Sequence, residues 1–342
     1  MRNALLALLA VVACVCGLTG CAHHETARPG QIQLGMVTDV GGLGDGSFND
    51  SAYRGLVRAR SDLDAYAQVL QSRSAADYQP NLIALTNLHF DMVYAIGFLM
   101  GDDLQAVATE NAKQRYAIID SVVDAPNVVS VTFREQDGSF LAGVLAAMMT
   151  KTHHVAFLGG IDTPLLIKFE AGFIAGAHEI DPNTRVDVKY VGSFEDVAAG
   201  KELTNVLFNA GADIVYAAAG KAGLGTIDAV KSRENAYVIG VDSDQDALAP
   251  GKVLTSMVKK VDVAVFDVAQ ALAAHKPLAG HIELGLRDHA IGLTDFAYTR
   301  AAIGPARLRT LDTVTTMIIN GRITPPKTRA ELATFTPVAL SR

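Results

Sequence analysis

The feature that most constrains the fold is a repeated alternation of short apolar runs with longer amphipathic segments, which begins at Ile32 and continues through most of the chain. The apolar runs are rich in Val, Ile and Ala, which is typical of strands buried on both faces. The segments between them place apolar residues at helical spacing, as at Phe48, Ala52 and Leu56. Strands joined by helices form parallel sheets with helices on both sides. The sequence therefore predicts an α/β protein.

The pattern falls into two sets, which separate near Thr150. Strands are expected at residues 32–39, 65–71, 91–97, 114–120, 127–133, 153–160, 186–192, 213–220, 236–242 and 252–258. Helices are expected at residues 48–60, 79–88, 99–112, 136–149, 165–179, 196–209, 223–234 and 261–275. The expected lobes are residues 32–149 with about 258–288, and residues 152–256 with about 289–325. Open α/β sheets bind ligands at the carboxyl ends of their strands, so a cleft is expected between those ends.

The N-terminus has the pattern of a bacterial lipoprotein signal. A basic start at Met1–Asn3 precedes an apolar run, Ala4–Gly17, that is short for a membrane span. Small residues then precede Cys21, as in a lipobox, where the chain is cut before a cysteine that becomes acylated. We expect a signal peptide at 1–20, a palmitate-type lipid on Cys21 and a polar tether at 21–31. This anchor would hold the protein on the extracytoplasmic side of a bacterial membrane, in the cell envelope; an ordinary signal peptide or a membrane anchor is the alternative.

Composition excludes several functions. Half of the 342 residues are apolar, which is enough for a folded core. The net charge is −7, from 29 Lys and Arg against 36 Asp and Glu, and no basic block occurs, so nucleic-acid binding is not expected. All three cysteines lie in or beside the leader, at Cys14, Cys16 and Cys21. The folded domain is therefore expected to have no disulfide, thiolate metal site or cysteine nucleophile.

Enzyme and metal motifs are incomplete. The glycine-rich stretch 217–226 lacks the order of a phosphate-binding P-loop, and no G-x-S-x-G nucleophile elbow occurs. His153–His154 flanks a strand without a carboxylate partner at helical spacing, and His23–His24 lies in the tether. Arg134–Glu135 follows a strand and is expected to make a surface or hinge contact. We expect no enzyme activity, no cofactor and no metal.

Three carboxylates follow separate predicted strands: Asp39, Asp120 and Asp242. The carboxyl ends of parallel strands meet at one rim, so these side chains are expected to converge. Taken singly, each also fits a helix cap or a turn, as Asp162 does before Thr163. A carboxylate accepts from two hydroxyls at once, which suits a ribose or another polyol, and it also suits the N–H edge of a heterocycle.

Aromatic residues accompany these strand ends in both lobes. Phe48, Phe169 and Phe194 are candidates to sandwich a flat ring by offset stacking. Phe169 is also spaced with Phe173 as two core residues of one helix would be. The aromatic positions thus leave a stacking role and a packing role open.

Polar and flexible positions complete the candidate set. Lys259 and Lys260 end a strand at an expected crossing between the lobes, where one of them could donate to a ligand oxygen or pair with a carboxylate. Asn49 can donate and accept, and either it or Ser47 could cap the helix that begins there. Gly220 permits close approach of the backbone to a ligand.

Five stretches then carry a family resemblance: 37–56 (VTDVGGLGDGSFNDSAYRGL), 133–151 (FREQDGSFLAGVLAAMMTK), 157–177 (FLGGIDTPLLIKFEAGFIAGA), 211–229 (GADIVYAAAGKAGLGTIDA) and 238–267 (VIGVDSDQDALAPGKVLTSMVKKVDVAVFD). Together they resemble the basic membrane protein family of bacterial lipoproteins, whose members include the purine nucleoside receptor of spirochaetes. The resemblance implies a type I periplasmic-binding-protein fold, with two Rossmann-like lobes, parallel sheets and a hinged cleft. It also implies a substrate-binding protein of an ABC importer that binds a nucleoside, preferably a purine, and works with permease and ATPase subunits.

The resemblance also implies roles for individual residues. Asp39 and Asn49 match polar positions of the first loop, and Phe48 matches the first aromatic clamp. Asp120 matches the carboxylate that faces the base, and Asp242 the carboxylate that binds the ribose.

On the other side of the implied site, Phe169 matches the opposing clamp, with Phe194 as the alternative. One of Lys259 and Lys260 belongs to the site. Residues 218–223 read AAGKAG where the family has AGGTG, so Lys221 replaces a glycine in a loop that bears on ligand selectivity.

Two other functions remain open for the same cleft. One is an extracytoplasmic sensor or signalling lipoprotein for a flat heterocyclic ligand, which a neighbouring histidine kinase gene would favour. The other is a nucleoside-processing enzyme, against which the lack of a catalytic residue set argues.

Overall fold

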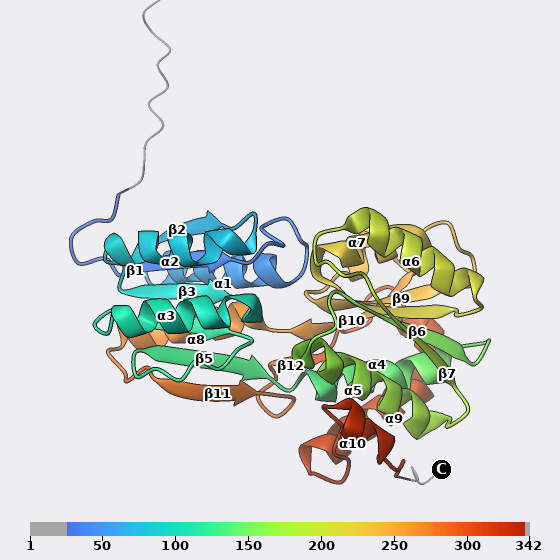
Figure 1. Cartoon of the computed structure of the whole chain (residues 1–342). Helices are drawn as coiled ribbons and strands as arrows, with labels where there is room; N and C mark the ends of the chain where they lie inside the picture. The colour runs from blue at the N-terminus through green and yellow to red at the C-terminus, as the bar shows by residue number, and fades with distance from the viewer. Residues whose placement is uncertain (1–25, 339–342) are drawn as a thin grey trace, which may run out of the picture.

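The chain forms two lobes, each built on a six-stranded sheet (Figure 1). The structure is a computed structural model that describes residues 26–338, so the predicted signal peptide and Cys21 lie outside the described residues. The first sheet has the order β11-β5-β4-β3-β1-β2, and all its adjacent pairs are parallel. Its strands are β1 (Gln33–Thr38), β2 (Tyr66–Gln71), β3 (Met92–Ile96), β4 (Tyr116–Ile119), β5 (Val128–Phe133) and β11 (Gly280–Leu284).

The second sheet repeats this design with the order β12-β10-β9-β8-β6-β7. Its strands are β6 (His154–Gly159), β7 (Arg185–Tyr190), β8 (Ile214–Ala218), β9 (Tyr237–Asp242), β10 (Val253–Lys259) and β12 (Ile291–Leu293). The edge pair β10–β12 is antiparallel, whereas the other adjacent pairs are parallel. The inner strands of both sheets are buried almost throughout, as their continuous apolar sequences require.

Helices cover both faces of each sheet. The first lobe has α1 (Phe48–Asp62) packed on α8 (Val261–Ala273), and α2 (Tyr78–Asn87) packed on α3 (Gly101–Glu110). The second lobe has α4 (Glu135–Met149), α5 (Pro164–Ile180), α6 (Val197–Asn209), α7 (Gly223–Val230), α9 (Arg300–Ile319) and α10 (Arg329–Ala333). A continuous apolar core runs under α1, α8, α4 and α5 from one lobe to the other, and smaller clusters lie under α2–α3 and under α6–α7.

Every strand and helix that the sequence predicts is present, with ends that differ by a few residues. The tail elements β11, β12, α9 and α10 have no predicted counterpart. β11 and β12 are short edge strands, and α9 is interrupted by Pro305 and by Gly304, whose φ of 79° is not helical. These features obscure the periodicity on which the prediction depends.

The chain crosses between the lobes after β5, after β10 and between β11 and β12. The position of α4 differs from the prediction, which grouped residues 135–149 with the first lobe. α4 packs along α5 of the second lobe, and glycines bring the two helices together. A Cβ at Gly143 would lie 2.0 Å from the carbonyl oxygen of Phe173, and one at Gly176 would lie 1.9 Å from that of Phe140. The first crossing therefore lies at Arg134, before the helix.

Candidate functional site

A cavity lies between the two lobes, at the carboxyl ends of their strands. The first lobe lines it with Asp39, Gly41, Asp45, Phe48, Asn49, Gly97, Phe98 and Asp120. The second lobe lines it with Leu165, Leu166, Phe169, Phe194, Ala218, Gly220, Lys221, Val241, Asp242 and Lys259. Of the candidate residues, Lys260 is the exception: it is exposed and precedes α8 outside the cavity, whereas its neighbour Lys259 is buried.

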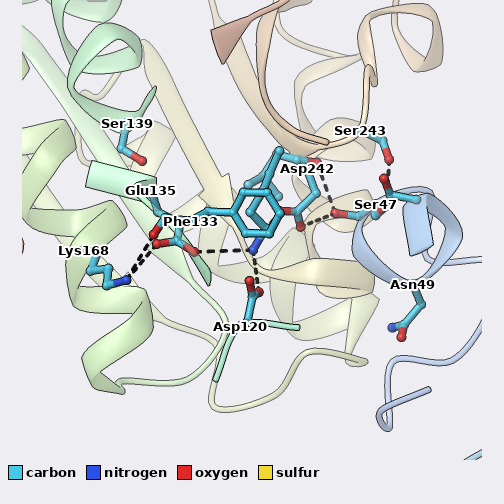
Figure 2. A network of polar contacts seen from close by, with 12 residues as sticks. Ser47, Asn49, Asp120, Phe133, Glu135, Ser139, Lys168, Asp242 and Ser243 are labelled. Carbon is cyan, nitrogen blue, oxygen red and sulfur yellow. Dashed lines mark hydrogen bonds and ion pairs between the residues drawn. The ribbon is translucent and has the colours of Figure 1, made fainter. Parts of the chain in front are cut away.

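The Lys259 ammonium lies at the centre of a charged network. Figure 2 labels the carboxylates of this network, Asp120, Asp242 and Glu135. Its Nζ is 2.5 Å from Asp120 Oδ2, 3.7 Å from Asp242 Oδ1 and 3.8 Å from Glu135 Oε1. Burial lowers the pKa of Lys259, but the three carboxylates outweigh burial and raise it above its usual range. Asp120 comes from the first lobe and the other members from the second, so the Lys259–Asp120 ion pair joins the lobes.

Aromatic rings surround the same ammonium. Lys259 Nζ is 4.8 Å from the centre of the Phe48 ring, 5.4 Å from that of Phe133 and 5.6 Å from that of Phe169. Phe48 and Phe169 therefore face one cavity from opposite lobes, as the stacking interpretation requires. Phe173, by contrast, packs in the core against Phe157.

Phe194 lies at another contact between the lobes. Its ring meets Phe98 edge to face, with 6.2 Å between ring centres. A Cβ at Gly160 would lie 2.2 Å from the Phe194 ring, so this position must be glycine for the ring to fit. Phe98 lies two residues after β3, and only the tertiary structure brings it to the cavity.

The carboxylates of the cavity have acceptor atoms without partners. Asp120 Oδ1, Asp242 Oδ1 and Asn49 Oδ1 are buried and accept no hydrogen bond. Asp120 and Asp242 have φ values of 70° and 63°, in the left-handed region that side chains other than glycine rarely adopt. Burial raises the pKa of both Asp39 and Asp242 to about 6. Unfilled buried acceptors and backbone strain are features of sites that bind a ligand.

In the loop before α1, the prediction that Ser47 or Asn49 caps the helix is wrong. Neither Ser47 nor Asn49 caps the helix with its side chain; Asp45 does so, accepting from the N–H of Ser47 at 2.9 Å and of Asn49 at 2.8 Å. The Ser47 hydroxyl instead donates to Asp242 Oδ2 at 2.9 Å, across the cleft. Asn49 Nδ2 donates to Asp39 Oδ1 at 2.8 Å and fixes that carboxylate. The first Asp of GDGSFND, two residues before Ser47, is the feature of the sequence that could have indicated Asp45 as the cap.

Two further expectations are corrected. Of the surface or hinge contact expected for Arg134–Glu135, the surface alternative is wrong for Glu135. It is fully buried beside Lys259, at a crossing between the lobes, and accepts from Lys168 Nζ at 3.0 Å. Asp162 does not cap α5, because Thr163 accepts from the backbone there while Asp162 pairs with Arg329. Both residues find partners that lie far away in the sequence.

Within residues 26–338, no group of three or more His, Cys, Asp or Glu side chains could hold a metal ion. None of the helices in this part of the chain has the length and apolar character needed to span a bilayer.

Two α/β lobes with mainly parallel sheets around a polar cleft define a type I solute-binding protein. A solute-binding protein of an ABC transporter system from Aeropyrum pernix superposes with a TM-score of 0.82 at 26% identity, over 89% of this chain and 96% of that one. Proteins of this class bind a small molecule and work with permease and ATPase subunits; they are not enzymes.

The chain belongs to the Bmp family, the PnrA-like ABC transporter substrate-binding proteins. The model of this family matches residues 32–327. The CD4+ T-cell-stimulating antigen of Listeria monocytogenes is 37% identical over 77% of this chain and 80% of that protein. The ABC transporter nucleoside-binding protein BmpA of Lactococcus lactis is 31% identical over 95% of this chain and 99% of that protein. The family resemblance and the fold expected from the sequence are thereby confirmed.

Proposed function

We propose that the cleft binds a nucleoside, preferably a purine nucleoside, for import by an ABC transporter. The observation that carries this proposal is the pairing of unfilled carboxylate oxygens with facing aromatic rings in one buried cavity. Hydroxyls of a sugar and N–H groups of a base are donors that such oxygens need, and a flat base is what the rings would stack on. The nucleoside-binding name of the Lactococcus relative supports the same ligand class.

In this proposal the base lies between Phe48 and Phe169. The free Oδ1 of Asp242 accepts from the ribose hydroxyls, and the free Oδ1 of Asp120 accepts from the base. Residues of both lobes would then contact one ligand, so the ligand favours the closed arrangement over an open one. Asn49 holds Asp39 at the rim and offers its own oxygen as a further acceptor.

Calorimetric titration with purine and pyrimidine nucleosides tests the ligand class. Wild type is expected to bind at least one nucleoside, and Asp242→Ala to bind it about 100-fold more weakly, because a desolvated charged partner is lost. Asp228→Ala is the matched control: Asp228 is exposed, pairs with Lys201 and does not line the cavity. No binding by any nucleoside below the millimolar range would reject the proposal.

The lipid anchor is a separate part of the proposal. We infer that Cys21 is acylated after removal of residues 1–20, which holds the protein on the outer face of a bacterial membrane, where its permease is. Labelling of expressing cells with a palmitate analogue is expected to mark the wild-type protein and not Cys21→Ser. Equal labelling of the two proteins would reject the anchor and leave the ligand proposal standing.

A further inference from the structure

Glu135 and Lys168 form a partly buried ion pair beside the charged network of the cleft (Figure 2). Glu135 is the first residue of α4, immediately after the chain crosses from β5, and none of its side chain is exposed. Lys168 of α5 donates from Nζ to Glu135 Oε2 at 3.0 Å and to the carbonyl oxygen of Phe133 at 3.2 Å. Neither Glu135 nor Lys168 lines the cavity. The pair therefore affects a ligand only through another residue.

That residue is Lys259. Glu135 Oε1 has no hydrogen-bond partner and lies 3.8 Å from Lys259 Nζ, which pairs with Asp120. Charges consequently alternate from α5 to the first lobe, in the order Lys168, Glu135, Lys259, Asp120. A buried ammonium is stable only with sufficient negative charge around it.

We propose that Glu135 is a positioning residue that holds Lys259 from behind, so that Asp120 and Asp242 each keep an oxygen free for the ligand. This inference rests on the proposed function of the cleft. Without the Glu135 charge, Asp120 and Asp242 alone would compensate the ammonium. Asp242 Oδ1, now 3.7 Å from Lys259 Nζ, would close on it, and Asp120 Oδ1 would turn toward it, so that neither oxygen would remain available to the ligand. Binding would weaken although no cavity-lining residue had changed.

The charge of Glu135 depends on the groups packed around it. Lys168 faces it from α5, Lys259 from β10, Asp120 from the end of β4 and Tyr216 from β8. Burial raises the pKa of Glu135 to about 7; Lys259 and Lys168 oppose this rise, and Asp120 adds to it. The carboxylate is therefore lost as the pH falls through about 7, and the support of Lys259 is lost with it.

The first test measures nucleoside affinity of Glu135→Gln and wild type by calorimetry from pH 8 to pH 5.5. The variant is expected to bind about tenfold more weakly at pH 8, because one charged interaction is missing. The difference should shrink toward pH 5.5, where wild-type Glu135 is itself neutral. Equal affinity at pH 8, or a ratio that stays constant with pH, would overturn the proposal, since a packing defect does not titrate.

Glu179→Gln is the matched control for this test. Glu179 is also buried and has a raised pKa from burial, but it contacts the tail backbone at Val338 and does not line the cavity. Its variant is expected to follow wild type at every pH. A pH-dependent loss as large as that of Glu135→Gln would count against a specific role of Glu135.

The second test needs no ligand and covers the case in which Glu135→Gln fails to fold. In ¹³C NMR of the ligand-free protein, the Lys259 Cε signal is expected to move with the midpoint at which Glu135 titrates. In Lys168→Met this midpoint should rise, because Glu135 has lost a stabilising cation. A Lys259 Cε signal that does not change with the protonation of Glu135 would overturn the inference. If the wild-type protein binds no nucleoside, the proposed function is rejected. The NMR result would still decide whether Glu135 acts on Lys259, because that test uses no ligand.

Discussion

Two ionic clusters of the molecule each contain a buried carboxylate but satisfy its oxygens in opposite ways. The tail clamp, formed by Arg329, Glu170, Asp162 and Tyr190, joins α10 to α5. Arg329 donates to the two oxygens of Glu170 at 2.8 and 2.7 Å and to those of Asp162 at 3.2 and 3.0 Å. The Tyr190 hydroxyl donates to Glu170 at 2.5 Å. Every carboxylate oxygen of the clamp has a partner, which is typical of a structural staple.

The cleft cluster, formed by Lys259, Asp120, Asp242 and Glu135, has more acceptors than donors (Figure 2). Each of its carboxylates keeps one oxygen without a hydrogen-bond partner. Burial raises the pKa of Asp242 to about 6 and that of Glu135 to about 7. The comparison shows that a buried ion pair alone does not indicate a binding site. What distinguishes the cleft is that several buried acceptors without hydrogen-bond donors gather at one cavity.

The largest effect is expected from Lys259→Met, which removes the cation of the cleft cluster. Asp120 and Asp242 would remain buried without a cation, and Glu135 would keep only Lys168, so the free energy of unfolding at pH 8 should fall by about 4 kcal/mol. The loss should diminish toward pH 5, as Asp242 and Glu135 become protonated. Urea denaturation at both pH values measures this change. Lys260→Met, at the exposed neighbouring position, should behave as wild type; a wild-type stability of Lys259→Met at pH 8 would remove the contrast between the clusters.

Arg329→Met should have an intermediate effect on stability and none on binding. It leaves the buried Glu170 with Tyr190 as its remaining partner, which should cost about 2 kcal/mol of unfolding free energy. The half-exposed position of Arg329 limits the loss. Denaturation and nucleoside calorimetry on the same preparation check both statements. Weakened binding with unchanged stability would mean that the tail clamp belongs to the site.

The smallest effect is expected from acidification of the ligand-free protein. The folded-state pKa values of Asp39 and Asp242, about 6, and of Glu135, about 7, lie above the usual values of 3.8 and 4.5. The folded state therefore binds more protons than the unfolded state between about pH 4 and 7, and stability rises as the pH falls from 7 to 5.

Exposed carboxylates with lowered pKa, such as Asp181 and Asp228, oppose this trend only below their usual pKa range. A net gain in stability is expected, visible in calorimetry as a higher Tm at pH 5. Asp242→Asn should show a smaller rise. A Tm that falls steadily from pH 7 to pH 5 would contradict the raised pKa values of Asp39, Asp242 and Glu135.

The central elements could be predicted from the sequence because buried strands and their covering helices follow local apolar patterns. The carboxylates at the strand ends could be predicted with them, since parallel strands place those ends at one rim. Which of Lys259 and Lys260 belongs to the cleft could not be predicted from the sequence. Adjacent residues project to opposite sides of an extended strand, and only the placement of β10 decides which one enters the cleft.

Long-range contacts decided the remainder. Ser47 could cap a helix or reach Asp242, and only the approach of the second lobe selects Asp242. Glu135 follows a crossing that looks exposed in the sequence, yet α5 brings Lys168 over it and buries it.

The sequence by itself determined two α/β lobes, the strand ends that carry acids and the family to which the chain belongs, because these depend on local periodicity and on long shared motifs. Tertiary structure alone decided which charges meet. A buried charge is stable only beside a partner, and here the partners come from separate elements or from opposite lobes.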